Sequence, residues 1–267
     1  MKTFFNELSV FMHYFRINIR AEAEQRVAFF LQQVGMMINN AAFLVSWILF
    51  INEFGAINGW GTYEVIGLWG FSSLVYGLTF SIFGGAAELK KAINLGVFDS
   101  VLLLPRSVYL RVFSLDIKTS SIGDIIFGVG FLILYGVFSP VSAWGLVSLL
   151  LAIIPAVLVM ANILLITSCI AFFLIDSEHV SNSAFYAFLD PSLYPSGPFQ
   201  GVARFVLIFI LPSLVVGGFP IEIAASPTIA HIVLVWAIGI VWTVLGYATL
   251  AACTRFYESG NLTGARL

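Results

Sequence analysis

Charged side chains are scarce in this sequence. Only 10% of its 267 residues are Asp, Glu, Lys or Arg, whereas 60% are hydrophobic, and a soluble domain carries roughly 25% charged residues. The mean hydropathy is +1.00. So few polar side chains cannot cover a water-soluble globule of this length. The composition therefore argues against soluble enzyme classes and predicts an integral membrane protein.

An excess of basic charge and a cysteine framework are also lacking. Lys and Arg together number 12 against 14 Asp and Glu, which argues against nucleic acid as the main partner because phosphate binding needs a basic surface. The two cysteines, Cys169 and Cys253, both lie inside long apolar runs. This arrangement predicts neither a disulfide framework nor a CxxC metal site.

Motifs of catalysis and nucleotide binding are missing as well. The three histidines, His13, His179 and His231, are far apart and none belongs to an HExxH pattern. A Walker A loop needs a lysine directly after a glycine, but the lysines here follow Met1, Leu89, Lys90 and Ile117. We therefore expect a chain that is not an enzyme and binds no metal, cofactor or ATP of its own.

What the sequence does contain is six long apolar segments. A bilayer core needs about 20 apolar residues in a helix, and dividing the chain at its charges gives candidate spans at 27–50, 65–83, 117–138, 146–175, 205–221 and 229–253. The chain is thus predicted to be a single, all-α transmembrane domain. The fifth segment is interrupted by Pro212 and Pro220, so both a shortened span and a re-entrant segment stay open for it.

Basic residues predict the orientation of these spans. If the N-terminus is cytoplasmic and all six segments cross, all twelve Lys and Arg side chains, including Arg204, fall on the cytoplasmic side or its membrane edge, as the positive-inside rule requires. Omitting the fifth span would place Arg255 and Arg266 outside. We therefore expect both termini to be cytoplasmic.

Residues 1–26 have the pattern of an amphipathic helix. Apolar side chains recur there at spacings of three and four, and Arg16 and Arg20 lie beside them. The pattern favours a helix that lies in the cytoplasmic headgroup layer ahead of the first span. A helix packed on a partner protein is the alternative. The apolar positions are Phe5, Leu8, Met12, Phe15 and Ile19.

A polar stripe follows the first span. Gln32, Asn39 and Ser46 are spaced by seven residues, and Gln33 and Asn40 lie one step round the helix. Unsatisfied amides in hydrocarbon cost several kcal/mol, so the stripe should face another helix or a wet path. Interhelical hydrogen bonding and a substrate translocation path both remain open.

Asp124, in the third span, is the deepest ionisable side chain. An intramembrane carboxylate is a candidate functional group by default, so we add Asp124 to the residues of a translocation path. It would also suit a proton-coupled secondary transporter, although no relay partner is evident. Together with Asp116 it gives thin support for a membrane enzyme that acts on lipids.

The segment between the second and third spans, 86–113, is too long for a tight turn and too apolar for a solvated loop. Leu89, Ile93 and Val97 fall on one helical face, and Gly96 and Pro105 bracket a second apolar stretch. We expect this segment to lie in the membrane interface or to dock on a cytoplasmic partner.

Two stretches resemble a known family. The run LGVFDSVLLLP, residues 95–105, resembles the Gly-x-x-Asp-x-x-Leu-x-x-Pro loop of bacterial ABC transporter permeases of the type-two export family. The run DPSLYPSGPFQGVARFVLIFILPSLVVGGFP, residues 190–220, resembles the fifth-span region of a six-helix branch of that family. With the six spans and the N-terminal helix, the resemblance covers nearly the whole chain. Leu104 departs from it, because a basic residue often precedes this proline.

The resemblance implies a permease subunit in the bacterial inner membrane. In that family two permease chains pair, identical or related, and separate ATPase subunits that hold ATP and Mg grip them from the cytoplasm. The segment 86–106 would then carry a coupling helix, and the turn near Glu222 would belong to an outer gate. The implied coupling residues are Lys90, Lys91, Leu95, Gly96, Asp99, Pro105 and Arg106, and the implied gate residues are Pro212, Pro220 and Glu222.

Overall fold

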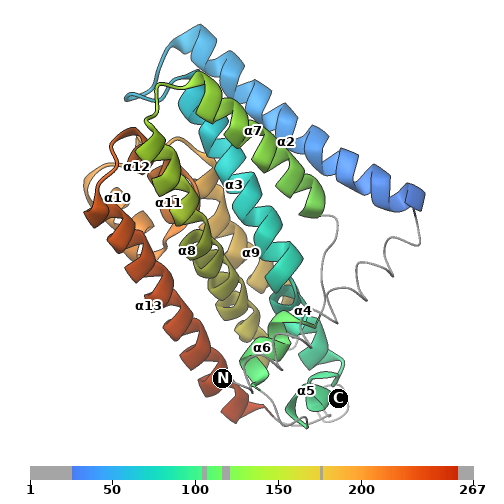
Figure 1. Ribbon diagram of the computed structural model, residues 1–267. Coiled ribbons are helices and arrows are strands. Elements are labelled where there is room, and N and C mark those ends of the chain that lie inside the picture. The colour runs from blue at the N-terminus through green and yellow to red at the C-terminus, as the bar shows by residue number, and fades with distance from the viewer. Residues whose placement is uncertain (1–25, 104–106, 116–120, 175–176, 258–267) are drawn as a thin grey trace.

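The computed structural model describes residues 26–103, 107–115, 121–174 and 177–257 (Figure 1). Throughout these ranges the regular structure is helical, apart from one isolated β-bridge between Ile57 and Trp60. Four helices are long and apolar enough to cross a bilayer. They are Phe29–Phe54, Thr62–Phe83, Ala143–Phe172 and Ile229–Phe256, and Ile122–Phe138 and Gly201–Ile210 are shorter apolar helices. The prediction of an all-α membrane protein is confirmed at this level.

Helices α2 (Arg26–Phe54), α3 (Thr62–Phe83) and α7 (Ile122–Phe138) pack side by side. Glycine allows α3 and α7 to approach closely in antiparallel directions: a Cβ added at Gly128 would lie 2.5 Å from the backbone nitrogen of Leu74. Small residues at such contacts are typical of membrane helices. The α2–α3 connection is a tight turn in which Asn58 and Gly59 both take positive φ, 46° and 85°, as a type I′ turn requires.

Helix α8 (Ala143–Ser168), continued by the 3₁₀ turn η2 (Cys169–Phe172), lies beside α13 (Ile229–Cys253) (Figure 1). Each begins at a side-chain N-cap, Ser142 for α8 and Thr228 for α13. Gly239 of α13 packs on Pro155 of α8, and Gly246 packs on Asn162. Because both numbers rise together by seven, the two helices run parallel, and one crossing must lie between them in the chain.

That crossing is made by α9 (Glu178–Leu189) and the 3₁₀ turn η3 (Asp190–Leu193). The segment follows α3 in the opposite direction. The Phe185 ring lies 5.9 Å from the Phe80 ring, Ser72 Oγ donates to the Ser192 carbonyl at 3.4 Å, and Gly197 packs on Trp60. The segment 178–197 therefore runs along the length of α3.

Three short helices lie at one end of the bundle: α4 (Gly85–Asn94), α5 (Phe98–Leu102) and α6 (Val108–Phe113) (Figure 1). We call this end the α4 end and the opposite one the α12 end. Helix α2 begins and α13 ends at the α4 end, because Gln33 packs on Gly123 near the start of α7 and Phe98 packs on Tyr257 just beyond η5 (Thr254–Phe256). The N-terminal amphipathic helix, Pro105, Arg106 and the start of the third span lie outside the described residues.

The segment expected as the fifth span, 205–221, differs from the prediction. It contains the end of α10 (Gly201–Phe205), the π-helical turn η4 (Val206–Ile210), α11 (Ser213–Val216) and the start of α12 (Gly218–Ala225). Pro212 has no N–H to continue the helix, and Gly217 separates α11 from α12. The preceding segment crosses the bundle instead.

This arrangement also corrects the position of Arg204. Its partner Glu222 belongs to α12, and Ala224 of the same helix lies against Gly145 at the start of α8. Arg204 therefore lies at the α12 end, opposite to Lys90 and Lys91, and not with the other described basic side chains as the charge pattern predicted. The ion pair with Glu222 neutralises Arg204 there.

Candidate functional site

The turn between α4 and α5 is built around Gly96. Helix α4 ends as the Leu95 N–H donates to the Lys91 carbonyl at 3.0 Å, and Gly96 then takes a φ of +71°. Glycine adopts this left-handed conformation without steric cost, which explains its place directly after a helix. Asp99 lies in the first turn of α5, where the helix dipole favours a carboxylate.

One face of this segment packs on its own bundle. Leu89 and Ile93 of α4 are buried, and so is Phe98 of α5. The Phe98 ring makes edge contacts with Phe172 and Tyr257 at centroid distances of 5.5 and 5.0 Å. These contacts attach the α4–α5 turn to the ends of α8 and α13.

The other face is apolar and uncovered within the described chain. Leu95 is 67% exposed and Leu103 84% exposed, and Val97 and Leu102 are exposed beside them in the sequence. We refer to these four residues as the exposed apolar surface. Apolar side chains grouped in this way mark a protein or membrane interaction site.

The two adjacent lysines take different positions. Lys91 is exposed, whereas Lys90 is half-buried and its Nζ donates to Oδ1 of Asn182 on α9. Sequence reasoning grouped both lysines at the edge of a docking surface and missed Asn182. No motif marks Asn182, because the contact joins residues 92 positions apart.

Helix α6 is tied to the bundle by two polar contacts. Arg111 Nη1 donates to the Val101 carbonyl at 2.7 Å, which fixes α5 against α6. The Tyr109 hydroxyl donates to Oδ1 of Asn162 on α8 at 2.6 Å. Burial raises the pKa of Tyr109, while the hydrogen bond to Asn162 lowers it. The net shift is upward.

The polar stripe of α2 divides into two faces. Gln33 and Asn40 are buried against α7, where Gln33 Oε1 accepts from the Gly123 N–H and Asn40 Nδ2 donates to Asp124 Oδ1, both at 2.5 Å. Three of the four residues expected along a translocation path lie on an exposed face. They are Gln32, Asn39 and Ser46.

Asp124 is 2% exposed and lies in the first turn of α7. The helix N-terminus and the Asn40 amide both favour a carboxylate there. Its second oxygen, Oδ2, has no hydrogen-bond partner among the described residues. The geometry assigns Asp124 at least one role, which is to pin α2 on α7.

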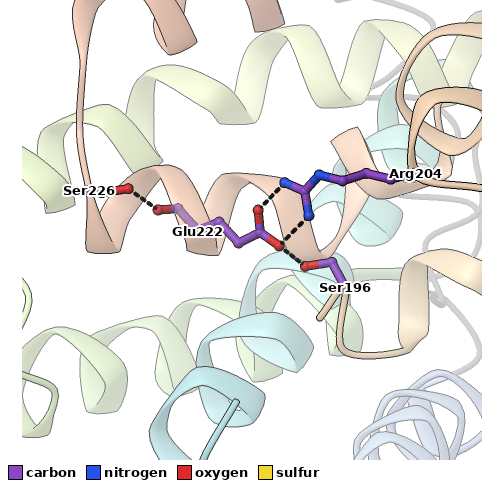
Figure 2. Close-up of polar contacts among 4 residues, drawn as sticks. All are labelled: Ser196, Arg204, Glu222 and Ser226. Carbon is purple, nitrogen blue, oxygen red and sulfur yellow. Dashed lines mark hydrogen bonds and ion pairs between the residues drawn. The ribbon is translucent and has the colours of Figure 1, made fainter. Parts of the chain in front are cut away.

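A second polar cluster lies at the α12 end (Figure 2). Arg204 on α10 donates to both carboxylate oxygens of Glu222 on α12, with Nη1 at 3.1 Å from Oε1, and Ser196 donates to Oε1 as well. Ser226 Oγ donates to the Glu222 carbonyl at 3.3 Å. We call these residues the Arg204–Glu222 cluster. The hydrogen bonds from Arg204 to Glu222 raise the pKa of the guanidinium.

This cluster joins three segments that are separate in the chain: the loop after η3, α10 and α12. The Arg204 guanidinium also lies 5.9 Å from the centroid of the Phe219 ring, within the range of a cation–π contact. Pro212 and Pro220, which were expected in an outer gate, are both buried and lie between Arg204 and Glu222 in the sequence. Sequence reasoning found Glu222 and missed its partners, because it placed Arg204 at the opposite end.

Comparison with known protein families gives a match over most of the chain. The model of a family described as "ABC-2 family transporter protein" matches residues 37–261. This range includes the three short helices of the α4 end, α9 and the Arg204–Glu222 cluster. No curated protein and no solved structure matches the chain.

Proposed function

This chain belongs to the ABC-2 family of transporter proteins and is a membrane permease, and from that premise we propose that it serves an ATP-driven exporter. Two permease chains pair to form the translocation path, and separate ABC ATPase subunits supply the energy. The substrate crosses a bacterial inner membrane between the two permeases.

The exposed apolar surface is the observation that carries this proposal. Its members project from a turn whose other face is fixed to α8 and α13 through Phe98. The sequence has no Walker A lysine, so an ATP-driven chain needs a partner that hydrolyses the ATP. A rigidly attached, uncovered apolar turn provides a place for an ATPase subunit to push. Gly96 gives the turn its shape, and Asp99 and Lys91 lie at its edges.

The distribution of charge supports a cytoplasmic α4 end. Helices α2, α3, α7, α8 and α13, together with α9–η3, would provide six crossings, with the start of α2 and the end of α13 on the same side. The described basic side chains of the α4 end are Lys90, Lys91, Arg111 and Arg255. The α12 end has Arg204, which is neutralised by Glu222. This asymmetry follows the positive-inside rule.

The exposed face of α2 supports the pairing of two permeases. Gln32 and Asn39 would face hydrocarbon in an isolated chain, at a cost of several kcal/mol for each unsatisfied amide. A second permease, or water in a path between the two, removes that cost. Asp124 of α7 lies on the opposite, buried side of α2, where Asn40 donates to it. At the α12 end, α10 to α12 with Pro212, Pro220 and Glu222 form the outer gate.

A pull-down of the chain in mild detergent tests the proposal. We expect an ATPase with a Walker A motif to co-purify, and Val97→Glu to remove it, because a carboxylate in the exposed apolar surface would be buried without a partner. Val202→Glu on α10 is the matched control, since Val202 is equally apolar and 81% exposed at the other end. Transport by the purified chain without any ATPase would overturn the proposal.

A further inference from the structure

The segment α9–η3 has a polar tie at each end. Near its start, Asn182 Oδ1 accepts a hydrogen bond from Lys90 of α4. Just beyond its end, Ser196 Oγ donates to Glu222 of the Arg204–Glu222 cluster, and the Gly197 carbonyl accepts from Asn58 at 3.2 Å. One continuous piece of chain thus touches the α4–α5 unit at one end and the Arg204–Glu222 cluster at the other.

The segment between these ties is built to be stiff. Helix α9 passes directly into η3 and together they cover residues 178–193, a length of roughly 26 Å at the rises of the two helix types. This range contains no glycine, and its proline, Pro191, lies at the start of η3 where its missing N–H costs little. Phe188 and Ser192 are buried against neighbouring helices.

The η3 end of this segment is in tight contact with the backbone at the start of α12, the helix that contains Glu222. A Cβ added at Gly217 would lie 1.9 Å from the Ser192 carbonyl oxygen, and one added at Gly218 would lie 2.7 Å from Ser196 Cβ. Ser72 donates to the Ser192 carbonyl and lies within 3.5 Å of the Val216 carbonyl. A shift of η3 along its axis must therefore move the start of α12.

Helix α8 also reaches both ends, from Asn162 beside Tyr109 to Gly145 beside Ala224. Helix α8 transmits movement along its axis less well than α9–η3, because Pro155 lies inside α8 between these two contacts. A proline interrupts the hydrogen bonds of a helix and lets it bend. The segment α9–η3 has no such interruption.

We propose that α9–η3 is the strut that carries movement of the α4–α5 turn to the Arg204–Glu222 cluster, with Asn182 and Ser196 as its positioning residues. This inference rests on the proposed function, in which an ATPase moves that turn. Displacement of α4 draws Asn182 with Lys90, the strut shifts past α3, and Ser196 moves relative to Glu222. The contacts that close the α12 end then loosen.

Hydrogen exchange measured by mass spectrometry on the purified permease–ATPase complex tests the strut. In the wild type we expect ATP with vanadate to change exchange in peptides that cover 197–226. Asn182→Ala removes the acceptor for Lys90, and we expect it to abolish this change while ATP hydrolysis and complex formation persist. Asn182→Asp keeps an acceptor oxygen and should restore the response. Ser183→Ala, an exposed serine on the same helix, is the control.

A response at 197–226 that persists unchanged in Asn182→Ala would overturn the strut, as would loss of the response in both Asn182→Ala and Asn182→Asp. Ser196→Ala provides a second test that leaves the α4 end intact: its response at 197–226 should be lost while that at 85–103 remains. A wild-type chain that binds no ATPase would instead overturn the proposed function, and the strut with it.

Discussion

Asp124 is the side chain at which two modes of energy supply give opposite expectations. In the wild type, Asn40 Nδ2 lies 2.5 Å from Asp124 Oδ1. Asp124→Asn keeps the shape of the side chain and an oxygen that can accept this hydrogen bond. It removes the carboxyl group that could take up and release a proton. An ATP-driven permease should retain most of its transport, because the contact that pins α2 on α7 remains. A proton-coupled transporter should lose transport entirely.

The measurement is substrate flux in membrane vesicles, with and without ATP. Asp124→Leu is the structural comparison. It leaves the buried Asn40 amide without its partner, which costs about 1–3 kcal/mol, so we expect a lower melting temperature in detergent. Loss of flux in Asp124→Asn at unchanged melting temperature would contradict the ATP-driven assignment.

Gly246 is a position where one methyl group decides whether two helices fit. A Cβ at this residue would lie 2.0 Å from Asn162 Oδ1, so Gly246→Ala must push α13 away from α8 or displace the amide from Tyr109. We expect a loss of about 1–3 kcal/mol in stability, seen as a lower melting temperature in detergent. Gly130→Ala is the control, because nothing lies within 4 Å of its added Cβ. An equal effect of both changes would refute the close contact.

The amide stripe shows what periodicity at the residue scale can and cannot predict. A spacing of seven placed Gln32, Asn39 and Ser46 on one line and put Gln33 and Asn40 one step away. Which of the two lines meets another helix depends on α7, whose Gly123 allows the Gln33 backbone to come close. That information lies some 90 residues away in the chain, so the sequence of α2 alone could not provide it.

At the scale of elements, hydropathy located the four long apolar helices and the shorter α7, but the segment 205–221 is broken into short helices. Residues 176–204 are rich in Ser, Pro and aromatic side chains, a composition that predicts a solvated connector or a second contact with an ATPase. In the structure their hydroxyls turn inward: Ser181, Ser192 and Ser196 are all buried. The more apolar residues 205–221 were predicted as a shortened span or a re-entrant segment, and prolines and glycines break them into short helices.

The position of α10 at the α12 end, which is the outer end in the proposed orientation, predicts the side of the membrane from which α10 can be labelled. With Cys169 and Cys253 replaced by alanine, we expect Val202→Cys to react with a membrane-impermeant maleimide in intact spheroplasts, because α10 lies at the α12 end. Lys91→Cys, exposed at the α4 end, should react only after lysis. Labelling of Val202→Cys only after lysis would restore 205–221 as the fifth span.

At the scale of the whole molecule, the chain is organised as two ends joined by helices. The α4 end has the exposed apolar surface and most of the described basic side chains, and the α12 end has the neutralised Arg204–Glu222 cluster. From the sequence, the family resemblance indicated a coupling segment at 86–106 and an outer gate near Glu222. The connection between them could not be predicted, because it depends on contacts such as Lys90 with Asn182 that no local pattern records.

The assembly of two permeases is testable on the exposed face of α2. Asn39 is exposed and polar on a helix that also presents apolar side chains such as Ile38 and Val45. In a lone chain its amide would lie in hydrocarbon, so we expect it to face a second permease across a narrow gap. Asn39→Cys, in a chain without its native cysteines, should then form a dimer with a short bis-maleimide in native membranes.

Ile133→Cys is the matched control, because Ile133 is 61% exposed on α7 and apolar, so it can face lipid without cost. The expected result is a band of twice the monomer mass for Asn39→Cys and monomer alone for Ile133→Cys. If the partner is a related chain and not a copy, the same reagent should link Asn39→Cys to a protein of different mass. Monomer alone for Asn39→Cys, with Ile133→Cys cross-linked, would place the contact between permeases on α7.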